Sequence, residues 1–353
     1  MKNLTVNLIS ESVYLPKGHG VHTAFLNMIE MLKEKKVQVL INSRQKTDIT
    51  HIHSIGPFAL YKLLTSKPVV VSAHIVPAND FPGSLIGTKY WLGLSEDYVR
   101  FFYNRADLVL AVSPKVKADL EAMGVTVPIE VMPNQVDTNL FYPDKSKREA
   151  ARKMLGFKDG DFVSLSVGQI MPRKGLATFL KVASQLPEIK FLWVGSRPFK
   201  RLTATENETE KSLEDAPGNF RLFDAGKLPY EDMPSLYNAA DIFFFPSHQE
   251  NFAIVVIEAA ATRLPLLLRD LPVYKIFQGR YIAGSEEKFA ENIKRLKEDK
   301  DYYSKWSKLA ISLAKKFNFD SLGDKLIQYY ISLEKQSSRC NLVIIKSSWS
   351  KNK

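Results

Sequence analysis

The sequence predicts an α/β protein made of two doubly wound domains, each a parallel sheet covered by helices on both faces. Short runs rich in Val, Ile, Leu and Phe alternate with helical patterns through residues 1–143, which is typical of parallel strands. This alternation stops between Pro133 and Pro143, and a second series of the same kind starts at Phe162. Because such sheets bind ligands at the carboxyl ends of their strands, we expect a binding cleft where the two domains face each other.

The first domain is expected to span residues 1–143. Its opening strand, residues 4–9, contains polar positions and no cleavage-type site follows it, so a signal peptide is not expected. An apolar face at helical spacing predicts the first long helix at residues 21–35. The other strands of this domain are expected at residues 37–41, 48–53, 68–72, 108–112 and 129–132.

The second domain is expected to span residues 144–315. Its strands are expected at residues 162–167, 191–194, 220–223, 242–245 and 266–268, and its helices at residues 148–155, 174–184, 233–239, 255–262 and 286–297. A further helix is expected at residues 316–335. Residues 336–353 do not continue the pattern and are expected to form an irregular tail, which is basic because it carries Arg339, Lys346, Lys351 and Lys353 and no acidic residue.

The composition excludes several classes of protein. Hydrophobic residues make up 45% of the chain and charged residues 25%, which are values of a globular protein and not of a disordered one. No apolar run reaches the roughly 20 residues that span a bilayer, and the single cysteine, Cys340, cannot form an internal disulfide. The net charge of +11 favours phosphate-bearing partners, but no nucleic-acid-binding signature accompanies it. No GxGxxG follows a strand, which argues against a dehydrogenase.

The stretch around Glu250 and Glu258 is the most informative in the chain. It follows an apolar strand and places Glu250 in a polar turn and Glu258 inside the next helix. The backbone N–H groups of Asn251, Phe252, Ala253 and Ile254 then lie at the helix N-terminus, where free donors and the helix dipole favour an anion. Two carboxylates beside such an end suit a ligand with phosphate and hydroxyl groups. The spacing alone also fits an amphipathic helix with two solvated glutamates.

Two other strand-to-helix turns carry residues suited to phosphate. Arg173 and Lys174 follow the strand at 162–167, and two adjacent cations there suit a diphosphate, although an ordinary turn with exposed cations has the same sequence. Gly18 and Gly20 follow the first strand, where glycine permits close approach of the backbone to a ligand. A simple turn would explain these glycines equally well.

Three histidines cluster near the ends of the early strands. His51 and His53 alternate on one strand and so share a face, which would suit a metal pair, but no third ligand accompanies them and a structural role is favoured. His74 follows the strand at 68–72, and a lone histidine at a strand end usually has a structural role.

Together these motifs resemble the retaining GT-B glycosyltransferases of glycosyltransferase family 4. The resemblance covers about residues 3–333 and includes Glu-x7-Glu, the Arg173–Lys174 pair, the glycine loop and the segment from Asn134 to Asp137. Two positions depart from the family pattern: His19 separates the glycines, and Gln135 replaces the customary glycine. The resemblance implies a GT-B fold, two Rossmann-like domains across a cleft, and a last helix (316–335) that packs back on the first domain.

The resemblance also implies roles for the site residues. Arg173 and Lys174 would neutralise the leaving nucleoside diphosphate, and His74 would lie near the transferred sugar. Glu250 with the N–H groups after it would hold the hexose, Glu258 would take the ribose hydroxyls, and Gly18 and Gly20 would face the donor. The expected donor is a UDP-hexose, with glucose or galactose as the sugar. We expect a metal-independent transfer without a cofactor, by front-face attack.

The acceptor is expected to be a membrane lipid. The segment 81–105 is aromatic and basic, and Lys89, Tyr90, Trp91, Arg100, Phe101 and Phe102 are its candidate membrane or acceptor contacts. A helix that packs its apolar face on its own domain would look the same. Residues 57–67 form a second, shorter candidate.

With these segments the chain is similar to bacterial diacylglycerol and glucosyl-diacylglycerol glycosyltransferases, which implies a cytoplasmic enzyme peripheral to the inner face of the cell membrane. Its partners would be the UDP-sugar, the lipid acceptor and an anionic membrane surface, with no nucleic acid. Transfer to a polysaccharide or other soluble acceptor and a non-catalytic partner subunit of the same fold remain as alternatives.

Overall fold

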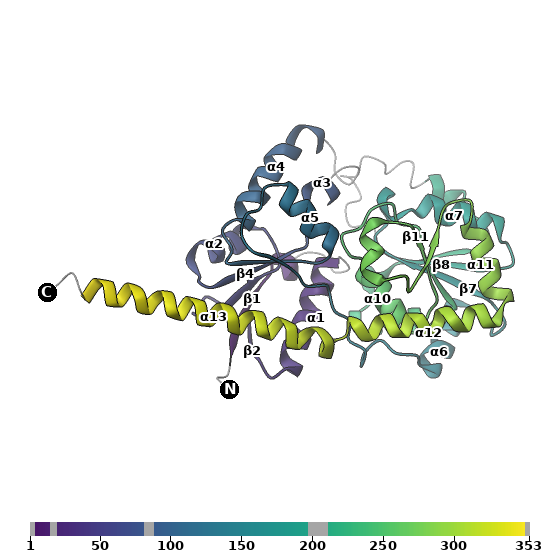
Figure 1. Cartoon of the computed structure of the whole chain (residues 1–353). Helices are drawn as coiled ribbons and strands as arrows, with labels where there is room; N and C mark the ends of the chain where they lie inside the picture. The colour runs from purple at the N-terminus through teal and green to yellow at the C-terminus, as the bar shows by residue number, and fades with distance from the viewer. Residues whose placement is uncertain (1–3, 15–19, 81–87, 197–210, 350–353) are drawn as a thin grey trace.

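The computed structural model describes residues 4–14, 20–80, 88–196 and 211–349. Within these ranges the side chains of 88–91, 227 and 338–349 are not described. The described chain forms two α/β domains side by side, each with its own parallel sheet (Figure 1). The fold class expected from the sequence is therefore present.

The N-terminal domain is built on a parallel sheet of six strands in the order β2-β1-β3-β4-β5-β6. The strands are β1 (Thr5–Ile9), β2 (Gln38–Ile41), β3 (Ile49–Ile52), β4 (Val69–Ala73), β5 (Leu108–Ala111) and β6 (Ile129–Val131). The helices are η1 (Glu11–Tyr14), α1 (Gly20–Glu34), α2 (Pro57–Thr65), α3 (Pro77–Asp80), α4 (Thr88–Tyr103) and α5 (Pro114–Ala122). Every strand predicted from the sequence for this domain is present, with each end within one residue.

The C-terminal domain has a second parallel sheet of six strands in the order β12-β11-β10-β7-β8-β9. The strands are β7 (Val163–Val167), β8 (Lys190–Val194), β9 (Phe220–Phe223), β10 (Ile242–Phe245), β11 (Leu266–Arg269) and β12 (Ile282–Gly284). The helices are α6 (Lys145–Leu155), α7 (Leu176–Gln185), α9 (Met233–Ala239), α10 (Ile254–Ala261), α11 (Phe289–Glu298) and α12 (Lys300–Lys316), with short helices η2 (Pro172–Lys174), η3 (Ala225–Lys227), η4 (Tyr230–Asp232) and η5 (Pro272–Phe277).

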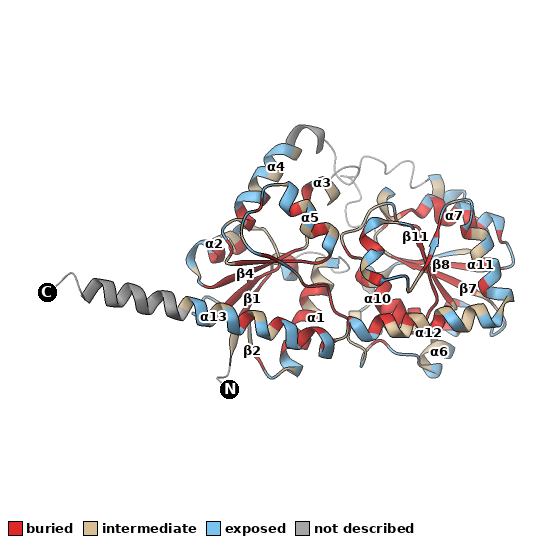
Figure 2. Cartoon of the chain, in the orientation of Figure 1, coloured by how far each residue is buried: buried red, intermediate tan, exposed pale blue. Residues whose placement is uncertain are grey.

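The central strands of both sheets are buried on both faces, which explains why these strands are continuous apolar runs (Figure 2). All four residues of β10 are inaccessible to solvent. Helix ends are fixed by local capping: Ser113 accepts from the Val116 N–H at the start of α5, and Asp144 accepts from the Lys147 N–H at the start of α6. Gly156 ends α6 in the left-handed conformation, with φ of 66°.

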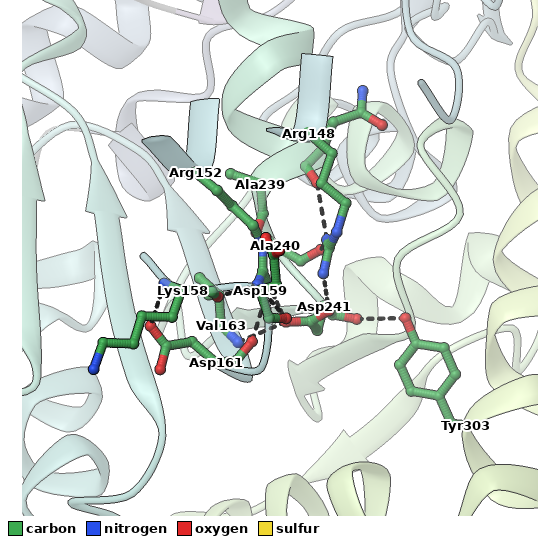
Figure 3. Close-up of polar contacts among 11 residues, drawn as sticks. Arg148, Arg152, Lys158, Asp159, Asp161, Val163, Ala239, Ala240, Asp241 and Tyr303 are labelled. Atoms are coloured by element: carbon green, nitrogen blue, oxygen red, sulfur yellow. Dashed lines mark hydrogen bonds and ion pairs between the residues drawn. The ribbon is translucent and has the colours of Figure 1, made fainter. Parts of the chain in front are cut away.

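A buried polar network ties α6 into the C-terminal domain (Figure 3). Its centre is Arg152, whose guanidinium donates to the backbone carbonyls of Ala239, Lys158, Asp159 and Asp161 and to the Asp241 carboxylate. Arg148 donates to the same carboxylate at 2.6 Å, and the Tyr303 hydroxyl donates to the Asp241 carbonyl at 3.0 Å. Asp241 therefore joins α6, the start of β10 and α12.

The last helix, α13 (Phe319–Trp349), crosses from the C-terminal domain to the N-terminal domain and packs there against α1 (Figure 1). The Tyr330 hydroxyl lies 2.6 Å from His51 Nδ1, and Lys35 forms an ion pair with Asp324 at 2.9 Å. Where an irregular tail is predicted from residue 336, the helix instead continues to Trp349. That prediction was wrong because a helix that has already been started by packing can continue through residues that carry no helical pattern of their own.

Candidate active site

A cavity of about 500 Å³ lies between the carboxyl ends of the two sheets. From the N-terminal domain it is lined by Gly20 at the start of α1 and by His74 directly after β4. From the C-terminal domain it is lined by residues that follow β7, β8 and β10: Gly168, Arg173, Lys174, Gly195, Ser196, Glu250, Asn251, Phe252, Ala253, Ile254 and Glu258. The structure thus brings the two cations, the two carboxylates and the histidine predicted from the sequence to one hollow.

Arg173 and Lys174 form the short helix η2, which the backbone holds against the turn after β10. Gly175 ends η2 with φ of 79°, and a Cβ there would collide with the Pro246 carbonyl, so only glycine fits. The Arg173 carbonyl accepts from the His248 N–H at 2.7 Å and from the Ser247 hydroxyl at 3.0 Å. These contacts place both cations beside the Glu250 turn.

Lys174 and Glu250 form the central ion pair of the cavity, with Nζ 2.6 Å from Oε1. The Ser247 hydroxyl donates to the same oxygen at 2.7 Å. Burial would raise the pKa of Glu250, but the charges of Lys174 and Arg173 and these hydrogen bonds outweigh it and lower the pKa. Glu250 is therefore an ionised hydrogen-bond acceptor at neutral pH.

Arg173 is placed to receive an anion. Its Nη1 donates to the Gln249 carbonyl at 3.3 Å, whereas its Nε is buried without an acceptor among the residues that the structure describes. A buried unpaired donor is costly, so a bound anion that accepts from the guanidinium would relieve that cost.

Glu258 lies inside α10 and is 2% exposed. The hydroxyls of Tyr230 and Tyr237 donate to its two oxygens at 2.7 and 2.5 Å. Burial raises the pKa of Glu258, and the two tyrosine hydrogen bonds offset this only in part. A carboxylate has about four lone-pair sites, so Glu258 can still accept hydrogen bonds from ligand hydroxyls.

The N-terminus of α10 forms part of the wall of the cavity. Ala253 caps the helix with φ of 68°, a left-handed conformation that is strained for alanine and typical of functional turns. Ala253 and Ile254 line the cavity. The Phe252 ring is instead packed between Phe277 and Phe317, so this residue can contribute only its backbone.

The three histidines form one row beside the cavity, in which His51 and His53 are buried and His74 is half-buried. His51 bonds Tyr330 and Ser72, His53 Nδ1 lies 3.1 Å from His74 Nε2, and only His74 lines the cavity. Burial lowers the pKa of His74 to about 4 and that of His51 to about 3. Neutral imidazoles are therefore expected at pH 7. Within the described residues, no group of three His, Cys, Asp or Glu side chains could hold a metal ion.

The residues predicted to contact the membrane or the acceptor differ in their exposure to solvent. Phe102 was a wrong prediction, because its ring is fully buried in the domain core, as is that of Tyr103. Phe101 is 43% exposed beneath the Arg105 guanidinium, and Arg100 is exposed and paired with Asp97. The side chains of Lys89, Tyr90 and Trp91, and Gly18 with the rest of its loop, lie outside the described residues.

Several polar residues that line the cavity or contact its carboxylates were missed by sequence reasoning. Ser247 donates to Glu250, Tyr230 and Tyr237 donate to Glu258, and Asp80 of α3 lines the cavity opposite Asn251. The tyrosines carried no sequence signal that distinguishes them from core tyrosines. Asp80 could have been suspected from its place soon after the end of β4, since site residues gather at strand ends.

Comparisons with known proteins match the chain to two family models and to curated relatives. The family model described as "Glycosyltransferase Family 4" matches residues 13–140, and the one described as "Glycosyl transferases group 1" matches residues 147–312. The alpha-galactosylglucosyldiacylglycerol synthase of Streptococcus pneumoniae is 33% identical over 297 residues, which cover 81% of this chain and 78% of the relative. The processive diacylglycerol alpha-glucosyltransferase of Acholeplasma laidlawii is 26% identical over 272 residues, covering 77% of this chain and 80% of the relative.

Solved structures share the fold at low identity. Anabaena HepE in complex with UDP and glucose superposes with a TM-score of 0.75 at 16% identity, covering 94% of this chain and 100% of that chain. Sucrose-phosphate synthase from Thermosynechococcus elongatus superposes with a TM-score of 0.77 at 18% identity, covering 94% and 99%. These likenesses concern the fold alone.

Proposed function

The chain belongs to the group 1 and family 4 glycosyltransferases, and from that premise we propose that it transfers a hexose from a UDP-hexose to a diacylglycerol-based membrane lipid. The proposal rests on one observation. A single cavity is lined by Arg173, Lys174, Glu250 and Glu258 of the C-terminal domain and by His74 of the facing domain. Cations and helix N–H groups suit a diphosphate, and carboxylates suit the hydroxyls of two sugars.

The donor would lie mainly against the C-terminal domain. Arg173 and Lys174 would bind the diphosphate, and the N-terminus of α10 would add backbone donors to the negative charge. Glu258, held by two tyrosine hydroxyls, would accept from the ribose hydroxyls. Two cations and a helix N-terminus supply the positive charge that other transferases obtain from a metal, so we propose that no metal is required.

Transfer would retain the configuration of the anomeric carbon. The bond between that carbon and the diphosphate oxygen breaks, and the acceptor hydroxyl oxygen forms the new bond on the same face. The acceptor proton passes to the departing phosphate oxygen, whose growing charge Arg173 and Lys174 stabilise. Glu250 would fix the hexose through its hydroxyls, and neutral His74 would hydrogen-bond the sugar from the opposite domain.

A lipid acceptor is supported by the two relatives named above, which act on diacylglycerol-based lipids according to their names. The N-terminal domain also exposes large apolar side chains to solvent: Leu94 and Phe101 on α4 and Tyr61 and Leu64 on α2. Leu94 is 75% exposed, and Arg105 lies over Phe101, a pairing of apolar and basic groups that suits an anionic bilayer surface. In the described part of the chain, no helix is long and apolar enough to cross a membrane. From the exposed apolar and basic side chains on α2 and α4 we propose attachment at the membrane surface.

The test supplies labelled UDP-glucose or UDP-galactose with anionic vesicles that contain diacylglycerol or its monoglucoside, and in parallel with a soluble oligosaccharide. We expect label in the organic extract of the vesicle reaction. Label that enters only the soluble oligosaccharide would refute the lipid acceptor, and no transfer from either donor to any acceptor would refute the proposed activity. The anomeric proton coupling of the isolated product reports whether configuration is retained.

A further inference from the structure

The side-chain amide of Asn251 belongs to the donor-side turn of the C-terminal domain, yet its hydrogen bonds reach the N-terminal domain. Its Nδ2 donates to the His74 carbonyl at 3.1 Å and to Asp80 Oδ2 at 2.9 Å, and its Oδ1 accepts from Asn79 Nδ2 at 3.3 Å. The neighbouring Gln249 also reaches across, with its Nε2 3.3 Å from Asn79 Oδ1. Asn251 is thus held by the segment that follows β4.

Asp80 is held in place by hydrogen bonds within its own segment, independently of Asn251. The same Oδ2 accepts from the Val76 N–H at 2.8 Å, and the Asp80 N–H donates back to the Val76 carbonyl at 3.0 Å. Asn79 is anchored in turn by a 2.9 Å hydrogen bond to Asp119 of α5. The acceptor side therefore presents a preorganised set of groups to the Asn251 amide.

We propose that Asn251 and Asp80 are positioning residues for hexosyl transfer, which hold the Glu250 turn and His74 in register across the cleft. This inference rests on the proposed function, because it assigns these residues a part in that reaction. Asn251 directly follows Glu250 and precedes the left-handed Ala253 at the start of α10. Its hydrogen bond to the His74 carbonyl therefore links the sugar-binding groups of the two domains.

The chemistry at position 251 requires an amide. Both hydrogens of Nδ2 go to acceptors, one a carbonyl and the other a carboxylate. An aspartate at this position would set its carboxylate against both acceptors, whereas an alanine would remove all three hydrogen bonds. The residues proposed to bind UDP, namely Arg173, Lys174 and Glu258, belong to the C-terminal domain alone. Loss of the cross-domain bonds should therefore slow transfer without weakening nucleotide binding.

The test compares kcat for transfer with the Kd for UDP in Asn251→Ala, Asp80→Ala and the double variant. For each single variant we expect kcat to fall on the order of 10- to 100-fold, because a hydrogen bond to a charged group is lost. The Kd for UDP should stay within about twofold of the wild-type value. The double variant should be little worse than the poorer single variant, because both remove the same link. Asn251→Asp should be the slowest, and adding Asp80→Asn should restore part of the rate, since the amide and the carboxylate then exchange places.

Asn104→Ala is the matched control, because this amide bonds the Gly124 carbonyl and Thr126 within the N-terminal domain. It should leave kcat unchanged. Asn251→Ala with wild-type kcat, or with kcat and UDP affinity reduced by equal factors, would overturn the inference while the proposed function stands.

Hydrogen exchange supplies a readout that needs no turnover. With UDP bound, the amides of residues 74–80 should exchange faster in Asn251→Ala than in the wild type. Equal exchange in the two proteins would contradict the inference. A wild type that transfers no hexose would instead contradict the proposed function, so the two failures can be told apart.

Discussion

The Nζ atom of Lys174 lies 2.6 Å from Oε1 of Glu250, although the two residues are 76 positions apart in the chain. Lys174 ends the turn after β7 and Glu250 lies in the turn after β10, and these strands are neighbours in the sheet. A single ion pair therefore connects the group proposed to bind the diphosphate with the group proposed to bind the hexose.

Arg173→Met is expected to weaken UDP binding by about 10- to 100-fold, because a charge-assisted hydrogen bond to the diphosphate is lost. Titration calorimetry with UDP measures the change. Lys181→Met on the exposed side of α7 is the matched control and should bind like the wild type. An Arg173→Met protein with wild-type affinity would remove this residue from the donor site.

Lys174→Met should affect stability as well as binding. It leaves the buried Glu250 carboxylate without its cation, so the pKa of Glu250 should rise and the free energy of unfolding should fall by roughly 3 kcal/mol. Urea unfolding at neutral pH measures this loss. Lys174→Met combined with Glu250→Gln should recover part of the stability, and no recovery would show that the pair is not energetically coupled.

Glu258→Gln should weaken UDP binding, with a smaller effect on uridine-free diphosphate, because the residue is proposed to bind the ribose. The carboxylate accepts from two tyrosine hydroxyls, and a glutamine keeps only one acceptor oxygen. Calorimetry with UDP and with pyrophosphate separates the two contributions. Equal weakening of both ligands would argue for a structural role of Glu258 alone.

The buried histidines should make the protein sensitive to acid. Burial holds the pKa of His51 at about 3, that of His74 at about 4 and that of His53 well below its ordinary value. Since these pKa values are lowered by folding, the stability is fully present above pH 6.5 and is lost as the pH falls toward the folded values. Each histidine contributes a slope of about 1.4 kcal/mol per pH unit in that window.

Urea unfolding between pH 7 and pH 5 measures this slope. His53→Gln should reduce it by about one proton relative to the wild type, whatever its effect on absolute stability. Asp80 and Glu258 have raised pKa values and act in the opposite direction at lower pH. An unchanged slope in His53→Gln would mean that His53 is protonated equally in the folded and unfolded chains.

Arg152→Met is expected to destabilise the C-terminal domain by roughly 3 to 5 kcal/mol, because it removes the buried guanidinium that donates to four carbonyls and to the Asp241 carboxylate (Figure 3). Thermal unfolding measures the loss. The exposed Lys153→Met on the same helix is the control and should unfold like the wild type. Similar unfolding of both variants would exclude Arg152 as an anchor of α6.

Much of the fold followed from the sequence because parallel strands buried on both faces are continuous apolar runs. All of the expected strands are present, and the site residues that follow them converge because parallel strands end at one edge. The strand β12, Ile282–Gly284, was not predicted, because three residues with one large apolar side chain give no periodic signal. The helix α12 was also missed, since its lysine-rich sequence has few buried positions.

Sequence reasoning failed where a role depends on a distant partner. Asp80 and Asn251 are 171 positions apart, and the sequence around either residue does not predict their hydrogen bond. The aromatic residues of α4 illustrate a different failure: Phe101 is exposed and Phe102 is buried, yet a core helix and an interfacial helix have the same amphipathic pattern. Only the packing of α4 on its own domain separates them.

The central claim is that Glu250 and its partners in the cleft catalyse hexosyl transfer. The most direct measurement is the rate at which label from UDP-hexose enters extractable lipid in anionic vesicles, for the wild type and for Glu250→Gln at matched folded concentration. We expect labelled glycolipid from the wild type and a loss of at least about 100-fold in Glu250→Gln, with circular dichroism unchanged, because a neutral amide cannot replace a carboxylate that holds the sugar in the transition state. Transfer by Glu250→Gln at the wild-type rate would contradict the account.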